Sequence, residues 1–142
     1  MGNLYLDGNH ITSLPESLGN LTSLGELNLY NNALVVLPES FGNLTSLAYL
    51  YLNSNALASL PESLTQLSNL NYININNNAI CPYALSGNLR DFLDQYNEQD
   101  KGDWRNVQDK GACDSDNDGV MDPGDNCPLV ANTDQADRNK IE

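Results

Sequence analysis

The chain has 142 residues, a formal net charge of −13 and an isoelectric point of about 4.1. So acidic a protein repels phosphate groups, and the composition therefore excludes binding to nucleic acid through phosphate contacts. No apolar stretch reaches the length of about 20 residues that crosses a bilayer, so we expect no transmembrane segment in this chain. The single histidine, His10, has no nucleophile paired with it, and we expect no enzymatic activity.

The first 80 residues repeat with a period of 23. The recurring residues are Leu6, Leu29, Leu52 and Ile75; Asn9, Asn32, Asn55 and Asn78; and Pro15, Pro38 and Pro61. A unit this short cannot bury its own apolar face, so the units must stack around one continuous core. The alternation Leu27-x-Leu29 predicts a half-buried strand in each unit, and stacked units would pair these strands into a parallel sheet.

A complete unit reads L-x-x-L-x-L-x-x-N-x-L-x-x-L-P-x-x-L-x-x-L-x-x, from Leu24 to Ser46 and again from Leu47 to Asn69. This pattern resembles the leucine-rich repeat family, in its subtype with a Leu-Pro step after the asparagine. The resemblance covers residues 1–80. It implies an α/β-type repeat solenoid with a parallel sheet on the concave face and short helical or irregular returns on the convex face. We expect the recurring asparagines to be structural, with their amides bonded to loop backbone of the same and adjacent coils.

The N-terminal end of the repeats has no covering segment, because Met1 lies one full period before Leu24. We interpret the chain as a fragment of a longer protein with no signal peptide. Its first coil would then expose apolar side chains and a strand edge, so we expect self-association there. A clean monomer on size-exclusion chromatography at high concentration would contradict this expectation.

The residues that flank the buried leucines of each strand point to the concave side. They are Asn3, Tyr5 and Asp7; Glu26, Asn28 and Tyr30; Tyr49, Tyr51 and Asn53; and Tyr72, Asn74 and Asn76. Tyrosine gives broad contact area at low entropic cost and asparagine gives adaptable hydrogen bonding, as in many antibody paratopes. The pattern therefore predicts a face that binds a protein or a glycan. Alternatively, these residues simply suit an exposed parallel sheet, since aromatic residues favour strands.

The period stops after Ile80, and residues 81–113 are predicted to cap the repeats. Leu85, Leu89, Phe92, Leu93 and Tyr96 have the spacing of one face of an amphipathic helix, and Trp104 follows. The stretch LRDFLDQY, with the later DW and Gln108, is similar to the cap of secreted leucine-rich repeat proteins from marine gammaproteobacteria. That similarity implies a secreted bacterial protein.

Residues 114–125, DSDNDGVMDPGD, have the ligand spacing of a calcium loop. Carboxylates stand at loop positions 1, 3, 5, 9 and 12, a glycine allows the sharp turn at position 6, and a backbone carbonyl is available at position 7. The candidate calcium ligands are Asp114, Asp116, Asp118, Val120, Asp122 and Asp125. The alternative is a solvated acidic linker, in which these carboxylates would repel one another.

The continuation DNCPLVANTDQAD, residues 125–137, resembles the thrombospondin type 3 repeat. That family wraps calcium ions with aspartates and has almost no other core, so the resemblance implies that the same six residues hold one ion. It also implies a partial calcium-binding repeat over residues 114–142. A second site would begin at Asp137, but the sequence ends at Glu142, so Asn132, Asp134 and Asp137 are doubtful ligands.

Three cysteines allow only one internal disulfide. By resemblance to the thrombospondin pattern, Cys113 pairs with the earlier Cys81, and Cys127 pairs with a cysteine beyond this chain or stays free. A bridge between Cys113 and Cys127 and three reduced thiols are the alternatives. The calcium-repeat context favours an oxidising compartment.

Together these features predict a secreted or cell-surface recognition module. Its concave face would bind a protein or glycan, and calcium would stabilise its C-terminal segment. The alternative is a structural spacer or adhesin stalk, stiffened by calcium, that has no defined ligand.

Overall fold

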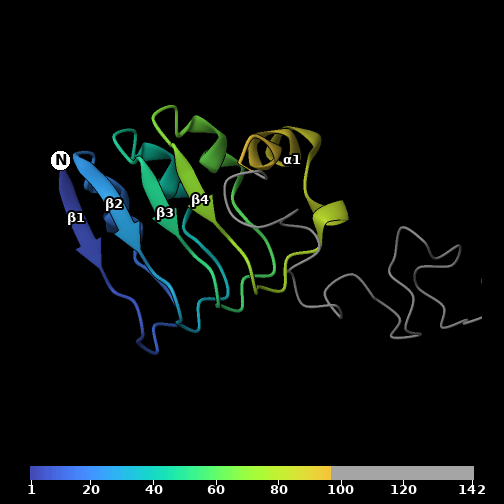
Figure 1. Cartoon of the computed structure of the whole chain (residues 1–142), viewed down its shortest axis with the longest axis horizontal. Coiled ribbons are helices and arrows are strands. Elements are labelled where there is room, and N and C mark those ends of the chain that lie inside the picture. The colour runs from blue at the N-terminus through green and yellow to red at the C-terminus, as the bar shows by residue number, and fades with distance from the viewer. Residues whose placement is uncertain (97–142) are drawn as a thin grey trace, which may run out of the picture.

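The computed structural model describes residues 1–96, which form a stack of coils with one parallel sheet (Figure 1). The elements in chain order are β1 (Gly2–Tyr5), η1 (Glu16–Asn20), β2 (Leu24–Asn28), η2 (Glu39–Asn43), β3 (Tyr49–Tyr51), η3 (Glu62–Gln66), β4 (Tyr72–Asn74), η4 (Pro82–Ala84) and α1 (Gly87–Asp94). Figure 1 shows the four strands side by side, with α1 beyond β4 at the end of the row. None of the helices within residues 1–96 is long and apolar enough to cross a membrane.

The register of the sheet follows the sequence period. The strands are parallel in the order β1-β2-β3-β4, and Leu4, Leu27, Leu50 and Ile73 are successive partners across it. Each partner therefore lies 23 residues from the next, apart from a register shift between Gly2 and Asn3 at the start of β1. The parallel sheet predicted from the leucine alternation is confirmed.

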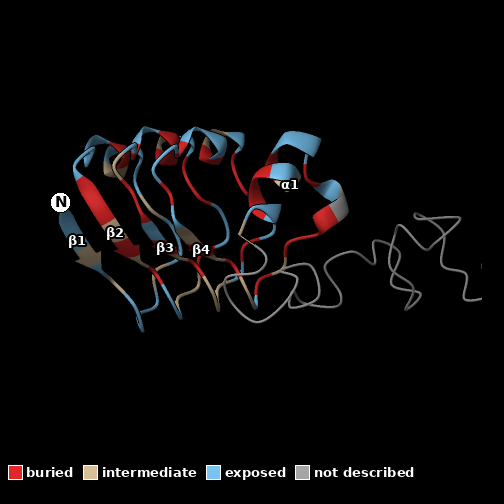
Figure 2. Cartoon of the chain, turned by 45° about the horizontal axis from the view of Figure 1, so that its top comes forward, coloured by how far each residue is buried: buried red, intermediate tan, exposed pale blue. Residues whose placement is uncertain are grey.

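The apolar residues of successive coils form one continuous core. Leu27, Leu29, Leu50 and Leu52 are fully buried, and the same cluster extends to the leucines of α1. Burying one such side chain contributes about 1.5–3 kcal/mol. Figure 2 shows this burial as red segments in β2, in the returns and in α1, whereas β1 is intermediate or exposed.

Each of the three returns that connect β1 to β2, β2 to β3 and β3 to β4 contains a five-residue 3-10 helix that starts directly after the proline of the Leu-Pro step. Pro15, Pro38 and Pro61 have extended backbone angles, and their carbonyls accept from the N–H three residues later at 3.0–3.1 Å. A proline suits this place because it has no N–H and its φ is fixed near −65°. The third residue of each helix then turns inward, which is why Phe41 and Leu64 are fully buried.

The recurring asparagines form the expected ladder between coils. The Asn55 carbonyl oxygen accepts from Leu34 N–H at 3.0 Å, and its amide nitrogen donates to the carbonyls of Leu29 and Leu52 at 3.0 and 2.9 Å. Asn78, which is only 2% exposed, makes the equivalent three bonds one coil later. These bonds satisfy amides that would otherwise be costly to bury, so the structural role predicted for the asparagines is confirmed.

One position in each coil has a left-handed backbone. It is occupied by Gly8, Asn31, Ser54 and Asn77, with φ of 67°, 56°, 58° and 54°. Glycine and asparagine adopt this conformation at low cost, whereas other residues are strained in it. Ser54 is therefore the residue least suited to its place in the series.

We expect Ser54→Asn to raise the free energy of unfolding by about 0.5–1 kcal/mol, because asparagine tolerates the left-handed conformation better than serine. The backbone bonds of residue 54, including its N–H to the carbonyl of Asn76 at 2.9 Å, stay in place. Urea denaturation would measure the change. Ser59→Asn, at a serine without positive φ, is the matched control and should have no comparable effect; equal stabilisation by both would contradict the explanation.

Beyond β4 the core continues into α1. The Ser86 hydroxyl caps this helix by accepting from Leu89 N–H at 3.1 Å, and Leu89, Phe92 and Leu93 are buried. The Tyr96 ring meets Phe92 edge-on, and its hydroxyl donates to the carbonyl of Leu70 at 3.2 Å. Burial raises the pKa of Tyr96, so this donor stays protonated at neutral pH. Trp104 and the rest of the predicted cap lie outside the described residues.

Candidate functional site

The outer face of the sheet carries the tyrosines and asparagines that the alternation predicts. Register places Asn3, Glu26, Tyr49 and Tyr72 in one row, and Tyr5, Asn28, Tyr51 and Asn74 in the next. The 23-residue step continues with Asp7, Tyr30, Asn53 and Asn76. We call these twelve residues the tyrosine face. The register thus aligns eight of the twelve predicted concave-face residues across one sheet. The other four, Asp7, Tyr30, Asn53 and Asn76, follow the ends of the strands, and their place on this face stays a prediction.

The tyrosine face has an exposed part and a packed part. Tyr5, Tyr30 and Tyr49 are 56%, 44% and 45% exposed. Tyr51 and Tyr72 are half-buried, and their ring centroids lie 5.2 Å apart with the planes inclined by 44°. The three exposed rings therefore have area available for a partner, while the other two support each other at the far end of the sheet.

Hydrogen bonds hold several polar side chains of this face in fixed orientations. Asn3 donates its amide to the Tyr5 hydroxyl at 2.9 Å, and that hydroxyl donates to Glu26 Oε2 at 3.0 Å. This chain links β1 to β2 and orients the carboxylate. Side chains that are already ordered lose less entropy when a partner binds, so the arrangement favours recognition.

Asn28 and Asn74 make local bonds of a second kind. Each accepts with its side-chain oxygen from the N–H two residues later, Tyr30 and Asn76 respectively, at 3.0 Å. The sequence did not show these bonds or the Tyr5–Glu26 bond, because alternation specifies the side of the sheet and not the rotamer. The sequence feature that could have indicated the local bonds is a polar residue that follows another after two positions on the same face.

All the charged side chains of the tyrosine face are negative. Asp7 and Glu26 are its only charged residues, and residues 1–89 contain no lysine or arginine. Asp7 is exposed and Glu26 is half-buried, and within residues 1–96 neither forms an ion pair. Within the part of the chain that the structure describes, this face therefore presents two carboxylates that pair with no positively charged side chain.

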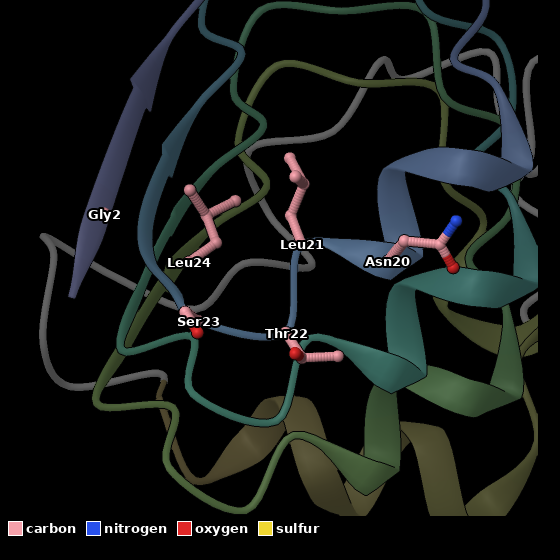
Figure 3. A pocket seen from close by; sticks show the side chains of 6 residues that line it. All are labelled: Gly2, Asn20, Leu21, Thr22, Ser23 and Leu24. Carbon is pink, nitrogen blue, oxygen red and sulfur yellow. The ribbon is translucent and has the colours of Figure 1, made fainter.

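A second surface feature lies at the N-terminal end of the stack (Figure 3). It is a pocket of about 320 Å³ lined by Gly2, Asn20, Leu21, Thr22, Ser23 and Leu24. Figure 3 shows Leu21 and Leu24 directed to the same side of the loop, and Leu21 is 44% exposed. Sequence reasoning did not identify this pocket, since nothing in the repeat distinguishes these residues from their equivalents in later coils. Its lining has no titratable side chain, so it offers no acid or base for catalysis.

The first coil, at this end of the stack, is less buried than the later coils. Leu4 and Leu6 are only half-buried, whereas Leu27 and Leu29 one period later are fully buried. In the described sheet, β1 is an edge strand that pairs only with β2. Self-association through this end stays a prediction.

The predicted calcium ligands and two of the three cysteines lie outside the described residues. These are Asp114, Asp116, Asp118, Val120, Asp122, Asp125, Cys113 and Cys127. Across the part of the chain that the structure describes, no group of three His, Cys, Asp or Glu residues could hold a metal ion. Cys81 is buried at the end of the last coil and is disulfide-bonded. Its pairing with Cys113 stays a prediction.

Comparison with known proteins identifies the repeated region. Residues 3–93 match the family model described as a leucine-rich repeat region. A solved structure of a leucine-rich repeat protein from Leptospira interrogans is 36% identical, with a TM-score of 0.62, over 68% of this chain. The match covers 24% of that chain, so the present sequence spans about a quarter of its length. No functionally curated protein matches the chain.

Proposed function

The chain belongs to the leucine-rich repeat family, whose repeats generally form binding modules rather than enzymes, and from this premise we propose that the tyrosine face recognises a protein or glycan outside the cell. The observation that carries the proposal is the set of three exposed tyrosines, namely Tyr5 on β1, Tyr49 on β3 and Tyr30 two residues beyond β2. Tyrosine is enriched at the centres of interfaces because it gives large contact area with few rotatable bonds. Fixed neighbours such as Glu26 add directional polar contacts.

The proposal predicts that Tyr30→Ala combined with Tyr49→Ala strongly weakens capture of the partner, because both rings are exposed. Loss of an aromatic anchor at an interface typically costs 2 kcal/mol or more, so binding should weaken at least about 30-fold. The measurement is a glycan array alongside a pull-down of surface proteins from host or neighbouring cells, which also separates the two ligand classes. The matched control is Val35→Ala with Val36→Ala, because these residues are 54% and 55% exposed and lie outside the tyrosine face. Capture unaffected by the tyrosine changes would contradict the proposal.

We also propose that residues 114–125 bind one calcium ion and that the protein is secreted or held at the cell surface. The support is the spacing of five carboxylates and one available carbonyl, which matches a loop for a hard cation. The disulfide at Cys81 supports an oxidising compartment, since disulfides are rare in reducing cytosol.

Titration of calcium into the chelator-treated protein should show about one ion bound per chain and a rise in melting temperature. Extracellular calcium modules bind calcium with dissociation constants of about 10⁻⁴ to 10⁻³ M. A calcium concentration of about 100 times the dissociation constant raises the free energy of unfolding by about 2.7 kcal/mol. Calorimetry with parallel thermal melts measures both effects. Asp118→Asn should remove the heat, whereas Asp109→Asn, just before the loop, is the control that should preserve it. No heat in the unaltered protein would refute the site.

A spacer or adhesin stalk is the second candidate function, favoured by the continuous core that joins the coils to α1. The function of a stalk depends on a stiff fold and does not require a ligand. The tyrosine variants distinguish the two functions, because they should leave a stalk unaffected.

A further inference from the structure

We infer that the tyrosine face binds its partner through two positively charged side chains, lysine or arginine, four residues apart on an extended peptide segment. This inference rests on the proposed function and specifies the chemistry of the partner. It starts from Glu26 and Asp7, the two carboxylates of this face, which form no ion pair within the described residues.

Each carboxylate has an exposed tyrosine one period later, in the next coil. Glu26 is the direct partner of Tyr49 across β2 and β3, and Tyr49 is 45% exposed. Asp7 lies one period from Tyr30, and the Gly8 N–H next to it donates to the Tyr30 carbonyl at 2.8 Å. A cation between a carboxylate and an aromatic ring gains both a charge-assisted hydrogen bond and a cation–π contact. Each pair is therefore suited to one lysine or arginine side chain.

The two carboxylate–tyrosine pairs have a fixed separation. Glu26 is aligned with Asn3 on β1, and Asp7 stands four residues after Asn3, in the turn that follows the end of β1 at Tyr5. Strand-like pairing with the next coil continues through this turn, because Leu6 N–H donates to the Asn28 carbonyl and Gly8 N–H donates to the Tyr30 carbonyl, both at 2.8 Å. Four residues of extended chain span about 13 Å. In an extended peptide, residues four apart point to the same side with this same spacing. The two pairs thus match basic residues at positions i and i+4 of a strand-like segment that runs along the face.

The state of Glu26 favours a cation over a neutral sugar. The carboxylate is half-buried and already oriented by the Tyr5 hydroxyl at 3.0 Å. Covering it with a neutral partner removes water from a charge without compensation, which opposes binding, whereas a guanidinium or ammonium group compensates the charge. We therefore expect a cationic peptide as the partner, and the experiments below would also detect a glycan.

The test uses two peptides of identical composition, Thr-Arg-Thr-Val-Thr-Arg-Thr and Thr-Arg-Thr-Val-Arg-Thr-Thr, both capped at their ends and labelled for fluorescence anisotropy. Their arginines are four and three residues apart, so only the first presents both to one side. We expect the full chain to bind the first peptide about tenfold more tightly at 0.15 M salt. Equal affinity for the two peptides would overturn the inference.

Charge variants separate this site from the general attraction of a chain with net charge −13. Glu26→Gln and Asp7→Asn should each weaken binding of the first peptide about tenfold. Glu39→Gln removes the same charge from an exposed residue of η2, on the returns and not on the sheet, and should change binding less than twofold. Equal effects of Glu26→Gln and Glu39→Gln would show a merely long-range attraction and overturn the inference.

The partner-capture assay tells the failure of this inference from the failure of the proposed function. If capture depends on Tyr30 and Tyr49 but neither peptide binds at the face, recognition stands and the cationic chemistry is wrong. Glycans captured in a tyrosine-dependent manner would give that same result. If capture does not depend on these tyrosines, the proposed function itself fails.

Discussion

Replacing Asn55 with alanine should lower the free energy of unfolding by about 2–4 kcal/mol. The Leu34 N–H loses its acceptor at 3.0 Å and becomes an unpaired buried donor, which costs about 1–3 kcal/mol. The carbonyls of Leu29 and Leu52 lose one donor each but keep a second, from Asn32 at 3.1 Å and from Asn78 at 3.0 Å. Equilibrium denaturation in urea measures the loss.

The control for this prediction is Asn53→Ala, two residues earlier in the same coil. Asn53 has no side-chain hydrogen bond within residues 1–96, so its truncation should change stability by no more than about 0.5 kcal/mol. The comparison holds the residue type and the chain region constant and varies only the ladder bonds. Similar losses for the two variants would mean that the ladder does not provide the stability assigned to it.

Gly42→Ala should destabilise the protein by about 1–3 kcal/mol, the usual range for overpacking. A Cβ at this position would lie 2.6 Å from the Ser63 carbonyl oxygen and 2.7 Å from the Ser63 Cβ, where η2 packs on η3. Gly19 faces Ser40 in the same way one period earlier. A glycine in this row therefore lets successive returns approach closely, and thermal and urea unfolding would measure the effect of adding a methyl group.

Thr65 provides the matched control, because it occupies the equivalent place in η3 and is exposed. Thr65→Ala should change stability by about 0.5 kcal/mol or less. Helix propensity alone predicts that Gly42→Ala stabilises the protein, since replacing a helical glycine with alanine normally raises the free energy of unfolding. A more stable Gly42→Ala protein would therefore disprove close packing as the reason for glycine there.

The period made much of the fold predictable. Leu27 and Leu50 recur with one spacing, so a parallel register followed as soon as the units were stacked. The role of Asn78 followed because a recurring buried amide needs backbone partners. The face that carries Tyr49 followed from alternation within a strand.

Other features depend on contacts that a pattern does not encode. The left-handed position was hidden because glycine, asparagine and serine alternate there, so no single residue type marks Ser54. The Tyr5–Glu26 bond depends on rotamers and on the neighbouring strand. The calcium ligands and Cys113 were predicted from motifs in a part of the chain outside the described residues, where spacing is the only guide.

The ladder also makes each coil an interchangeable unit. Asn32, Asn55 and Asn78 each bond backbone of their own coil and of the coil before, with the same donors and acceptors each time. Adding or deleting a whole number of 23-residue units would therefore place each ladder asparagine against the same backbone donors and acceptors as before. No new interior donor or acceptor would be left without a partner. A single-residue insertion between an asparagine and the next strand has no such compensation. The geometry thus permits the array to change length by duplication and loss of whole repeats, and restricts smaller changes to the outer surfaces.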